Sequence, residues 1–403
     1  MNEAVRLKFI CHLGYGDSLP KEDDLVGNIP VFGSNGPYAT TSEKNTGVPS
    51  IVVGRKGPYG KLNWAQEGCF ASDTTFFIDK ELTNASLRWL YWALQTLKLD
   101  EGSQEAAVPG LNRDSVYEQR VLLPVDDHQQ IIADYLDRET AHIDALLAEK
   151  ERMLALLEEK RATLISHAVI QGLNPTVAIK HSGASWFDTI PKNWSVERLK
   201  WVITSVLSGV SVNASDQPVD GSAFGVLKTS AVFGGRFFPE ENKSVWKKEF
   251  ERLSCPVTCD TIIMSRMNTP ALVGESGYVD CDYPNLFLPD RLWKISFDKE
   301  RIHVPFMALL LSSKEARQAL SSMATGTSPS MKNLAIEEML SLLVPIPPLQ
   351  EQIVIHQKLV VYEKRVILLR EELLKSCLLL KERRTALITA AVTEQISTEE
   401  MSL

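Results

Sequence analysis

The amino-acid sequence predicts an α+β chain in which two globular α/β domains alternate with two long helices that pair as an antiparallel coiled coil. Two observations predict this architecture. The stretch EEKRATLISHAV, residues 158–169, has a close counterpart in KERRTALITAAV, residues 381–392. Each copy ends a segment of about 40 residues without proline or glycine, in which apolar residues recur every seven positions. We define the repeat register as the shift that places Glu158 on Lys381.

The heptad spacing predicts which residues form the seam between the helices. In the second copy the heptad position is apolar five times without interruption, whereas the first copy has Lys150 where the second has Leu373. The predicted seam residues are Leu136, Ile143, Leu157 and Leu164 in the first copy and Leu359, Val366, Leu373, Leu380 and Leu387 in the second. A long helix with one apolar stripe needs a partner. The other copy is the simplest one, and an antiparallel pair makes the chain pseudo-twofold symmetric.

The repeat also predicts the domain boundaries. Residues 1–122 form the first globular head, and residues 173–342 form a linker and the second head. The helical spacers cover residues 123–172 and 343–394, and residues 395–403 form a tail. The heads themselves are only faintly alike. SIVVGRKGPYG in the first head resembles TIIMSRMNTPALVG in the second, and SDTTFFI and DYPNLFL are expected to occupy similar places.

Two similar heads on a shared pair of helices suit a linear polymer such as duplex DNA, whose half-sites recur at about 34–36 Å. In the first head, basic and aromatic residues gather in GRKGPYGKLNW. The candidate DNA-binding residues there are Arg55, Lys56, Tyr59 and Lys61. Basic side chains bind phosphates, and arginine can also read guanine. The alternative is a solvated hairpin loop with ordinary surface charge.

In the second head, two stretches have the chemistry of base and phosphate contacts. The candidates are Lys228, Thr229, Arg236 and Lys243 in VLKTSAVFGGRFFPEENKSVWKK, and Arg266, Asn268 and Thr269 in SRMNTPALVG. Arg55 and Arg266 stand at matched positions, each where a β-rich run enters a loop, which predicts a common task at the DNA surface. The alternative for each residue is a structural role in its own domain.

Composition and motifs exclude several other classes of protein. The formal net charge is −8, so only local charge can attract a polyanion. Six cysteines without a second close pair favour free thiols in a reducing compartment, and no apolar run is long enough to span a bilayer. These features predict a soluble, cytoplasmic protein. No nucleotide-binding loop, nucleophile elbow or metal-ligand spacing is present, so no catalytic or metal site is expected.

The whole chain resembles the specificity subunit of type I restriction-modification systems. The resemblance rests on both helix openings, PVDDHQQIIADYLD and PIPPLQEQIVIHQKL, on SGASWFDTIPKNWSVERLK before the second head, and on GVLKTSAVFGGRF and ATGTSPSMKNL within it. DDHQQ at the first helix departs from the PP-x-x-EQ pattern that the second helix keeps.

The resemblance implies that each head is a target recognition domain that reads one half of a bipartite, asymmetric DNA site. It also implies a chain without catalytic activity, whose helices dock two modification subunits, joined in restriction complexes by restriction subunits that translocate DNA. S-adenosylmethionine, ATP and magnesium are then expected on those partners and not on this chain. Two alternatives remain at this stage: a specificity module of a stand-alone DNA methylation system, and a coiled-coil scaffold that binds only proteins.

Overall fold

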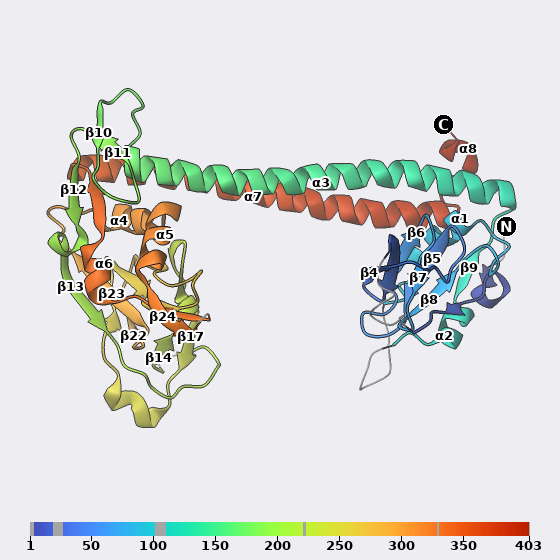
Figure 1. Cartoon of the computed structure of the whole chain (residues 1–403), viewed down its shortest axis with the longest axis horizontal. Coiled ribbons are helices and arrows are strands. Elements are labelled where there is room, and N and C mark those ends of the chain that lie inside the picture. Colours follow the sequence, from blue (N-terminus) through green and yellow to red (C-terminus); the bar gives the residue numbers. More distant parts are fainter. Residues whose placement is uncertain (1–3, 19–26, 101–109, 221–222, 329, 403) are drawn as a thin grey trace. The chain divides into compact units, whose positions relative to one another are not determined.

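The computed structural model describes residues 4–18, 27–100, 110–220, 223–328 and 330–402, so Pro329 of the ATGTSPSMKNL motif lies outside the described residues. The chain divides into two compact units (Figure 1). Unit 1 comprises Met1–Arg152 and Glu372–Leu403, and unit 2 comprises Met153–Glu371. Each unit therefore consists of one head and one half of each long helix.

Unit 1 begins with the head and continues into the first long helix. Its elements are β1 (Ala4–Arg6), the 3-10 turn η1 (Leu7–Phe9), β2 (Gly14–Tyr15), β3 (Ile29–Gly33), β4 (Gly36–Thr41), β5 (Ser50–Gly54), β6 (Leu62–Ala65), β7 (Phe70–Ala71), β8 (Thr75–Ile78), α1 (Leu87–Gln95), α2 (Arg113–Glu118), β9 (Arg120–Leu122), the first part of α3 (Asp126–Gln171), the last part of α7 (Leu349–Val392) and α8 (Thr398–Met401).

The first head is built around the four-stranded sheet β2-β8-β5-β6. Its inner strand β5, with the sequence SIVVG, is buried over its full length, as expected of a β-branched run with a strand on either side. Helix α1 begins at Ser86, whose hydroxyl accepts a hydrogen bond from Trp89 N, and it packs on β5 and β6. Strands β4-β3-β7 form a second sheet, and β1 pairs with β9.

Unit 2 contains the larger head. Its elements are β10 (Ile179–His181), β11 (Thr189–Pro191), β12 (Ser195–Arg198), η3 (Leu199–Trp201), β13 (Ile203–Ser208), β14 (Gly225–Leu227), η4 (Thr229–Ala231), β15 (Val232–Phe233), β16 (Gly235–Phe237), β17 (Asn242–Ser244), η5 (Lys247–Arg252), β18 (Pro256–Val257), β19 (Thr261–Ser265), β20 (Met267–Asn268), β21 (Ser276–Val279), β22 (Tyr283–Phe287), β23 (Leu292–Phe297), α4 (Val304–Ser312), α5 (Lys314–Met323), β24 (Thr325–Ser328), β25 (Met331–Asn333), α6 (Ile336–Ser341) and β26 (Leu343–Ile346). The last part of α3 and the first part of α7 complete it.

The second head repeats the topology of the first. Four neighbouring strands of its six-stranded sheet have the order β13-β23-β19-β21, which corresponds element by element to β2-β8-β5-β6. Strand β19, TIIMS, is buried throughout like β5, and Arg266 follows it as Arg55 follows β5. The predicted match between SIVVGRKGPYG and TIIMSRMNTPALVG is therefore confirmed for these strands.

The predicted match between SDTTFFI and DYPNLFL is wrong. SDTTFFI forms β8, which pairs with β5, whereas DYPNLFL forms β22, which pairs in parallel with β14 in another sheet. The true counterpart of β8 is β23, LWKISF, beside β19. Short aromatic-rich strands have similar compositions, and their place in a sheet is decided by the surfaces on which they pack.

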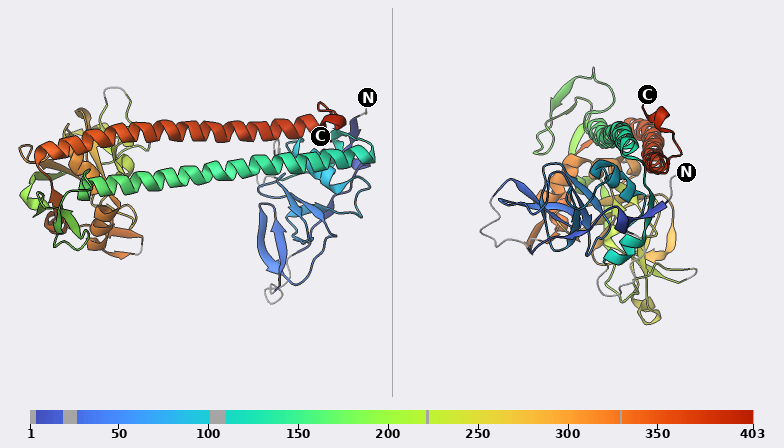
Figure 2. Two further views of the ribbon diagram at one scale, coloured as in Figure 1. Left: turned by 90° about the horizontal axis from the view of Figure 1, so that it is seen from above. Right: turned by 90° about the vertical axis from the view of Figure 1, so that its right-hand side faces the viewer.

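The two long helices lie side by side within each unit (Figure 2). In unit 1, Arg384 of α7 contacts Asp144 of α3 at 2.9 Å, and Lys381 contacts Glu151 at 4.0 Å. Since the residue number rises in α3 while it falls in α7, the helices are antiparallel. The predicted α+β fold with two long, mutually packed helices is confirmed.

The seam residues differ in burial. Leu136, Ile143, Leu359, Val366 and Leu373 are buried. Leu157, Leu164, Leu380 and Leu387 are half-buried, as is Lys150. The best-buried position of each copy, Leu136 and its match Leu359, lies where the helix joins its own head, and each belongs to the core of its unit.

Candidate nucleic-acid interface

Arg55 leaves strand β5 with its guanidinium over two aromatic rings. Its Cζ lies 4.9 Å from the centroid of the Tyr15 ring and 5.6 Å from that of Phe76. The main chain is held on both sides, because Arg55 N donates to Thr74 O at 2.8 Å and Arg55 O accepts from Leu111 N at 2.8 Å. The position of Arg55 is thus set by the sheet, while its side chain stays half-buried at the surface.

An open hollow of about 300 Å³ lies beside Arg55. It is lined by Tyr15, Arg55, Lys56, Phe76, Gly110, Leu111, Asn112, Arg113 and Asp114. The Cζ of Arg113 lies 5.0 Å from the Tyr15 ring, and its Nε is buried without a hydrogen-bond partner among the described residues. Three cations and one carboxylate therefore line the hollow, which favours an anion such as a phosphate.

Arg266 is placed in the second head as Arg55 is in the first. Its Cζ lies 5.4 Å from the ring of Trp293 in β23, the counterpart of Phe76 in β8. Its carbonyl accepts from Leu334 N at 2.8 Å, as that of Arg55 accepts from Leu111 N. The repeat register of the helices also places Leu111 on Leu334. The Nε of Arg266 has no hydrogen-bond partner within the described ranges.

The other candidates of the first head lie around the same loop. Lys56 is exposed and its amide donates to Ser34 Oγ at 3.3 Å. Lys61 is exposed, and its Nζ donates to the carbonyl oxygen of Asn35 at 2.7 Å. Tyr59 is half-buried, and its amide donates to Gly57 O at 2.8 Å. Of these residues only Lys56 lines the hollow beside Arg55, while Tyr59 and Lys61 lie further along the chain between β5 and β6.

Two lysines of the second head have carboxylate partners. Lys243 Nζ lies 2.5 Å from Asp216, and its hydrogen bond holds the pKa of the Asp216 carboxyl below its ordinary value. Lys228 lies 3.8 Å from Glu241, and the neighbouring Thr229 is half-buried. Both lysine charges are partly neutralised within unit 2.

Arg236 contacts a long helix. Its Nη2 donates to Glu363 of α7 at 3.2 Å, and Glu363 also accepts from Arg161 of α3 at 3.1 Å. The FGGRF loop is thereby fastened to both helices, with Arg236 still largely exposed. Arg236 therefore has a structural role in unit 2, and its contact with DNA stays a prediction.

Asn268 ends the short strand β20 after Arg266, and Thr269 follows it. Asn268 Nδ2 donates to Ser265 Oγ at 3.3 Å, and its Oδ1 accepts from Thr269 N at 2.9 Å. Thr269 is exposed, and its carbonyl accepts from Leu272 N at 3.0 Å. The structure therefore brings Arg266, Asn268 and Thr269 together on one loop, apart from the ion pairs of Lys228 and Lys243.

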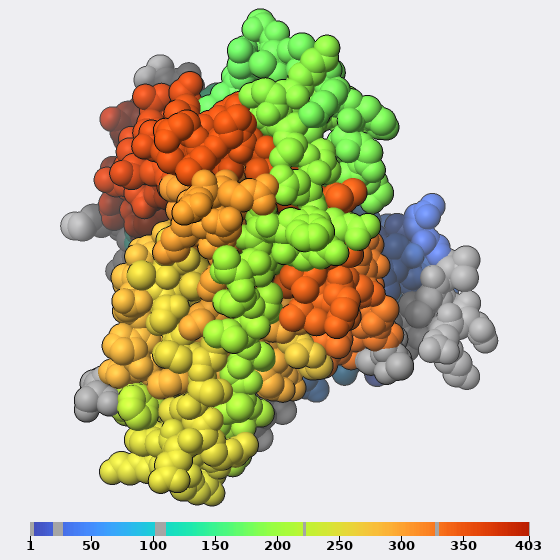
Figure 3. Space-filling model, turned by 90° about the vertical axis from the view of Figure 1, so that its left-hand side faces the viewer, coloured from blue at the N-terminus to red at the C-terminus, as the bar shows by residue number. Residues whose placement is uncertain are grey.

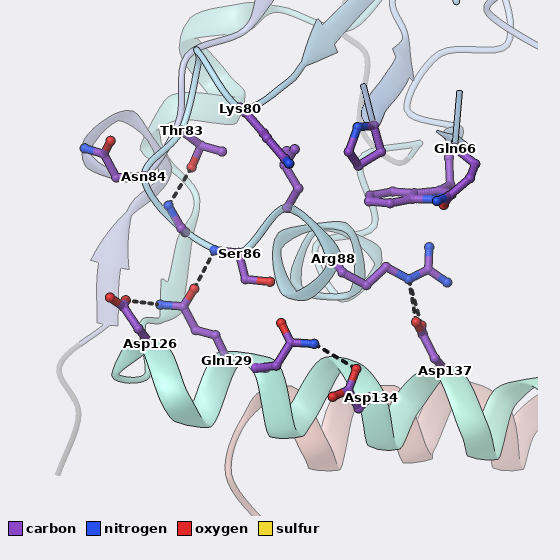
Figure 4. A pocket seen from close by; sticks show the side chains of 15 residues that line it. Gln66, Lys80, Thr83, Asn84, Ser86, Arg88, Asp126, Gln129, Asp134 and Asp137 are labelled. Carbon is purple, nitrogen blue, oxygen red and sulfur yellow. Dashed lines mark hydrogen bonds and ion pairs between the residues drawn. The ribbon is translucent and has the colours of Figure 1, made fainter. Parts of the chain in front are cut away.

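A buried glutamine joins the first head to its helix. Gln129 of α3 accepts a hydrogen bond from Ser86 N, at the start of α1 (Figure 4). It also donates to Pro124 O. In unit 2, Gln352 of α7 accepts from His303 N, at the start of α4, and donates to Pro347 O. The repeat register places Gln129 on Gln352, so the repeat carries the same junction twice.

A cavity of about 920 Å³ lies beside the first junction and contains an arginine held by aromatic rings (Figure 4). Arg88 of α1 donates to Asp137 of α3 at 2.7 Å, and Trp92 Nε1 donates to the same carboxylate at 2.8 Å. The Arg88 Cζ lies 4.6 Å from the Trp64 ring and 5.0 Å from the Tyr91 ring. These contacts fix the orientation of α1 relative to α3.

The second junction contains a histidine pair instead. His303 Nε2 lies 3.0 Å from His356 Nδ1, so one ring donates to the other. Burial lowers the pKa of both rings; the charge of His303 further lowers the pKa of His356, and Asp260 partly opposes the shift of His303. Unit 1 has Ala133 at the position matched to His356.

We expect acid to destabilise unit 2 through this pair. The folded-state pKa values lie below the unfolded value of about 6.5, so the unfolded chain binds protons more readily. The stabilisation is therefore complete above about pH 6.5 and is lost as the pH falls toward the folded-state values. Circular dichroism melting curves between about pH 7.5 and 5 should show a weaker pH dependence in His356→Ala than in wild type.

The exposed His167 of α3 provides the control, because His167→Ala should melt with the wild-type pH dependence. An unchanged pH dependence in His356→Ala would contradict the role of the pair.

Several residues of these sites carry no signal in the sequence that marks them as part of a site. Tyr15 and Arg113 reach the hollow at Arg55 from outside the basic loop, and no local pattern marks them. Gln129 and Gln352 did carry a signal, since they match in the repeat, but their buried hydrogen bonds depend on the heads above them.

Part of the chain matches a known family model, and known proteins of that family are similar to it. Residues 2–154 match the family model of the type I restriction modification DNA specificity domain. The chain is similar to type I specificity subunits. It is 23% identical over 232 residues to the EcoEI specificity subunit of Escherichia coli, which is 57% of this chain and 37% of that relative. It is 22% identical over 289 residues to the MjaVIII specificity subunit of Methanocaldococcus jannaschii, which is 70% of this chain and 65% of that relative. Each match spans less than two thirds of the relative's own length.

The fold of this chain is also similar to that of a solved structure. A chain in a structure described as "Structural basis underlying complex assembly and conformational transition of the type I R-M system" matches with a TM-score of 0.71 and 14% identity, covering 98% of both chains. At this identity the match concerns the fold alone. The predicted resemblance to type I specificity subunits is confirmed.

Two further kinds of feature are absent from the part of the chain that the structure describes. Over the described ranges no group of three or more His, Cys, Asp or Glu side chains is arranged to hold a metal ion. None of the helices in the same ranges is both long and apolar enough to cross a membrane.

Proposed function

We propose that this chain is the non-catalytic DNA-reading subunit of a type I restriction-modification complex. Each head reads one half of a bipartite duplex site, and the long helices dock two modification subunits. S-adenosylmethionine chemistry belongs to those subunits, and ATP and magnesium belong to restriction subunits that join them. The relatedness to type I specificity subunits supports this proposal.

The observation that carries the proposal is that one strand order presents two different sets of polar side chains. Arg55 and Arg266 leave matched strands and have matched main-chain partners. Arg55 stands among Tyr15, Lys56 and Arg113, whereas Arg266 stands beside Trp293 and Asn268. A shared frame with different contact groups suits two different half-sites, since bases are distinguished by the groups that meet their edges.

Methylome sequencing tests this function. Cells that express the modification subunit with this chain should carry a new methylated motif of two defined halves around an undefined spacer. Cells that express the modification subunit alone provide the control and should lack that motif. An unmethylated genome in the presence of both proteins, with the complex assembled, would contradict the proposal.

Replacing Arg55 or Arg266 by alanine is expected to weaken binding of the specific duplex by about 1–3 kcal/mol, because a well-placed arginine–base contact has this value. A base contact predicts a relaxed preference at one position of the motif. A phosphate contact predicts weaker binding to every sequence and a salt slope reduced by about one. Titrations of specific and scrambled duplex at two salt concentrations separate these results.

Arg138→Ala is the control for these two variants, because Arg138 is an exposed residue of α3 outside the candidate site. If Arg55 and Arg266 only brace their heads against Tyr15 and Trp293, alanine lowers the melting temperature and leaves the affinity of the folded complex unchanged. That result would remove both residues from the DNA interface.

A further inference from the structure

A four-residue motif, RLK followed by an aromatic residue, occurs once in each unit. It includes none of the candidate DNA-binding residues and neither glutamine of the two junctions. RLKF, residues 6–9, and RLKW, residues 198–201, each bridge the end of a strand and a 3-10 turn. Both strands pair with the strand that precedes a long helix, with Arg6 opposite Arg120 and Arg198 opposite Leu343. The repeat register places Arg120 on Leu343, so the two segments occupy the same place in the repeat.

The two segments hold their backbones in the same way. Leu7 N donates to Gln119 O at 2.9 Å, and Leu199 N donates to Leu342 O at 2.9 Å. Both leucines are fully buried. A buried leucine anchors each turn, and the aromatic residue two positions later is presented outward on a fixed backbone.

The aromatic rings are exposed to an unusual extent. Phe9 is 74% exposed and Trp201 is 64% exposed, which are the two highest values among the large apolar side chains of the described residues. Lys8 Nζ lies 5.3 Å from the Phe9 centroid, and Lys200 Nζ lies 4.9 Å from the Trp201 centroid. Exposed aromatics on a rigid backbone are typical anchors of protein–protein interfaces.

Carboxylates accompany both aromatic residues. Glu118 lies 3.1 Å from Lys8 and 3.2 Å from Arg6. Glu197 lies 2.7 Å from Arg301, which also donates to Trp201 O at 3.1 Å. Phosphates are repelled by carboxylates, so an aromatic centre with charges of both signs around it favours a protein partner over DNA.

The surface of unit 2 around residue 200 is accessible. Figure 3 shows the yellow-green segment near residue 200 on the face turned toward the viewer, beside orange segments of the second head. A hollow of about 580 Å³ lies there, lined by Val196, Glu197, Arg198, Lys200, Trp201, Arg301 and Leu343. We define aromatic patch 1 as Arg6, Lys8, Phe9 and Glu118, and aromatic patch 2 as Glu197, Arg198, Lys200 and Trp201.

We propose that aromatic patches 1 and 2 each provide, beside the long helices, a contact for one copy of the modification subunit, an inference that rests on the proposed function. The heads differ where they are expected to read different half-sites, but RLKF and RLKW repeat the same residue types on the same backbone, and each has a glutamate beside it that comes from a different element. A surface that is duplicated within a diverged pair suits a partner that is the same on both sides. Two identical modification subunits meet this requirement.

The test counts modification subunits on the full chain. The chain is purified with the type I modification subunit from the same genome, and native mass spectrometry measures the copies bound over a dilution series. Wild type should bind two. Phe9→Ala and Trp201→Ala should each weaken one of the two sites by about 30-fold, the effect of losing an interface anchor. The double variant should weaken both, and the exchange Phe9→Trp with Trp201→Phe should keep both.

Two control variants test whether the loss of binding is specific to the patches. Tyr38→Ala and Leu207→Ala remove exposed apolar side chains outside the patches and should leave two copies bound. If wild type binds two copies and the double variant does so with the same affinity, the patches do not dock this partner and the proposed function stands. If the double variant keeps both copies and loses DNA affinity, the patches contact DNA and do not dock this partner, and the proposed function again stands. If wild type binds no copy, the proposed function itself fails, and the inference fails with it.

Discussion

Leu136→Ala is expected to lower the stability of unit 1 by about 2–5 kcal/mol, because truncating a fully buried leucine removes apolar contacts and leaves a cavity. Leu136 has no exposed surface and packs in the core that joins α3 to the first head and to the end of α7. Leu359→Ala should do the same to unit 2, where Leu359 holds the matched position. Hydrogen exchange measured by mass spectrometry reports the stability of each unit separately.

Each of the two variants is the control for the other, because Leu136 and Leu359 lie in the cores of different units. Peptides of unit 1 should lose protection in Leu136→Ala and those of unit 2 in Leu359→Ala. Leu146→Ala and Leu368→Ala remove exposed leucines from the same helices and should cost less than about 0.5 kcal/mol. Equal loss of protection from the exposed and the buried positions would contradict this account of the junction cores.

Exchanging residues 1–122 for the first head of another specificity subunit is expected to change one half of the methylated motif completely. The other half and the spacer length should persist, because α3 and α7 remain and the second head is untouched. Methylome sequencing of cells that express the hybrid with the modification subunit measures all three. A change in both halves would contradict the modular arrangement.

The donor head can be chosen from the contacts of the junction. Gln129 needs a main-chain N–H at the start of α1, which any residue except proline supplies, whereas Asp137 needs the side chains of Arg88 and Trp92. A donor with arginine and tryptophan at these places should give a stable hybrid. A matched donor without them leaves Asp137 without its partners and should melt at a lower temperature while still changing only one half-site.

The main architecture of the chain was predictable because its signals are local or periodic. Seven-residue spacing without proline or glycine predicts long helices, and the repetition of that spacing predicts that they pair. The likeness of SIVVGRKGPYG and TIIMSRMNTPALVG, which does not follow the repeat register, predicts that Arg55 and Arg266 stand at matched positions. Their strands β5 and β19 are continuous β-branched runs, so the pattern survives even in diverged heads.

Strand order and ion pairing could not be predicted. The predicted match of DYPNLFL with SDTTFFI is wrong, because a strand's composition does not identify its neighbour. The partner of Arg236 is Glu363, 127 residues away, and that of Lys243 is Asp216, 27 residues away. Such contacts exist only after the sheets have packed, and no spacing in the sequence encodes them.

The sequence by itself determined that two heads share one pair of antiparallel helices, because periodic apolar residues must be buried wherever they occur. It also contained the RLKF and RLKW match, which is short and does not follow the repeat register of the helices. Only the tertiary structure decided that this match is one surface displayed twice. The register of β1 on β9 and of β12 on β26 makes the two segments equivalent, and burial of Leu7 and Leu199 turns Phe9 and Trp201 outward. Exposure is a property of packed neighbours, and the identity of a residue does not set it.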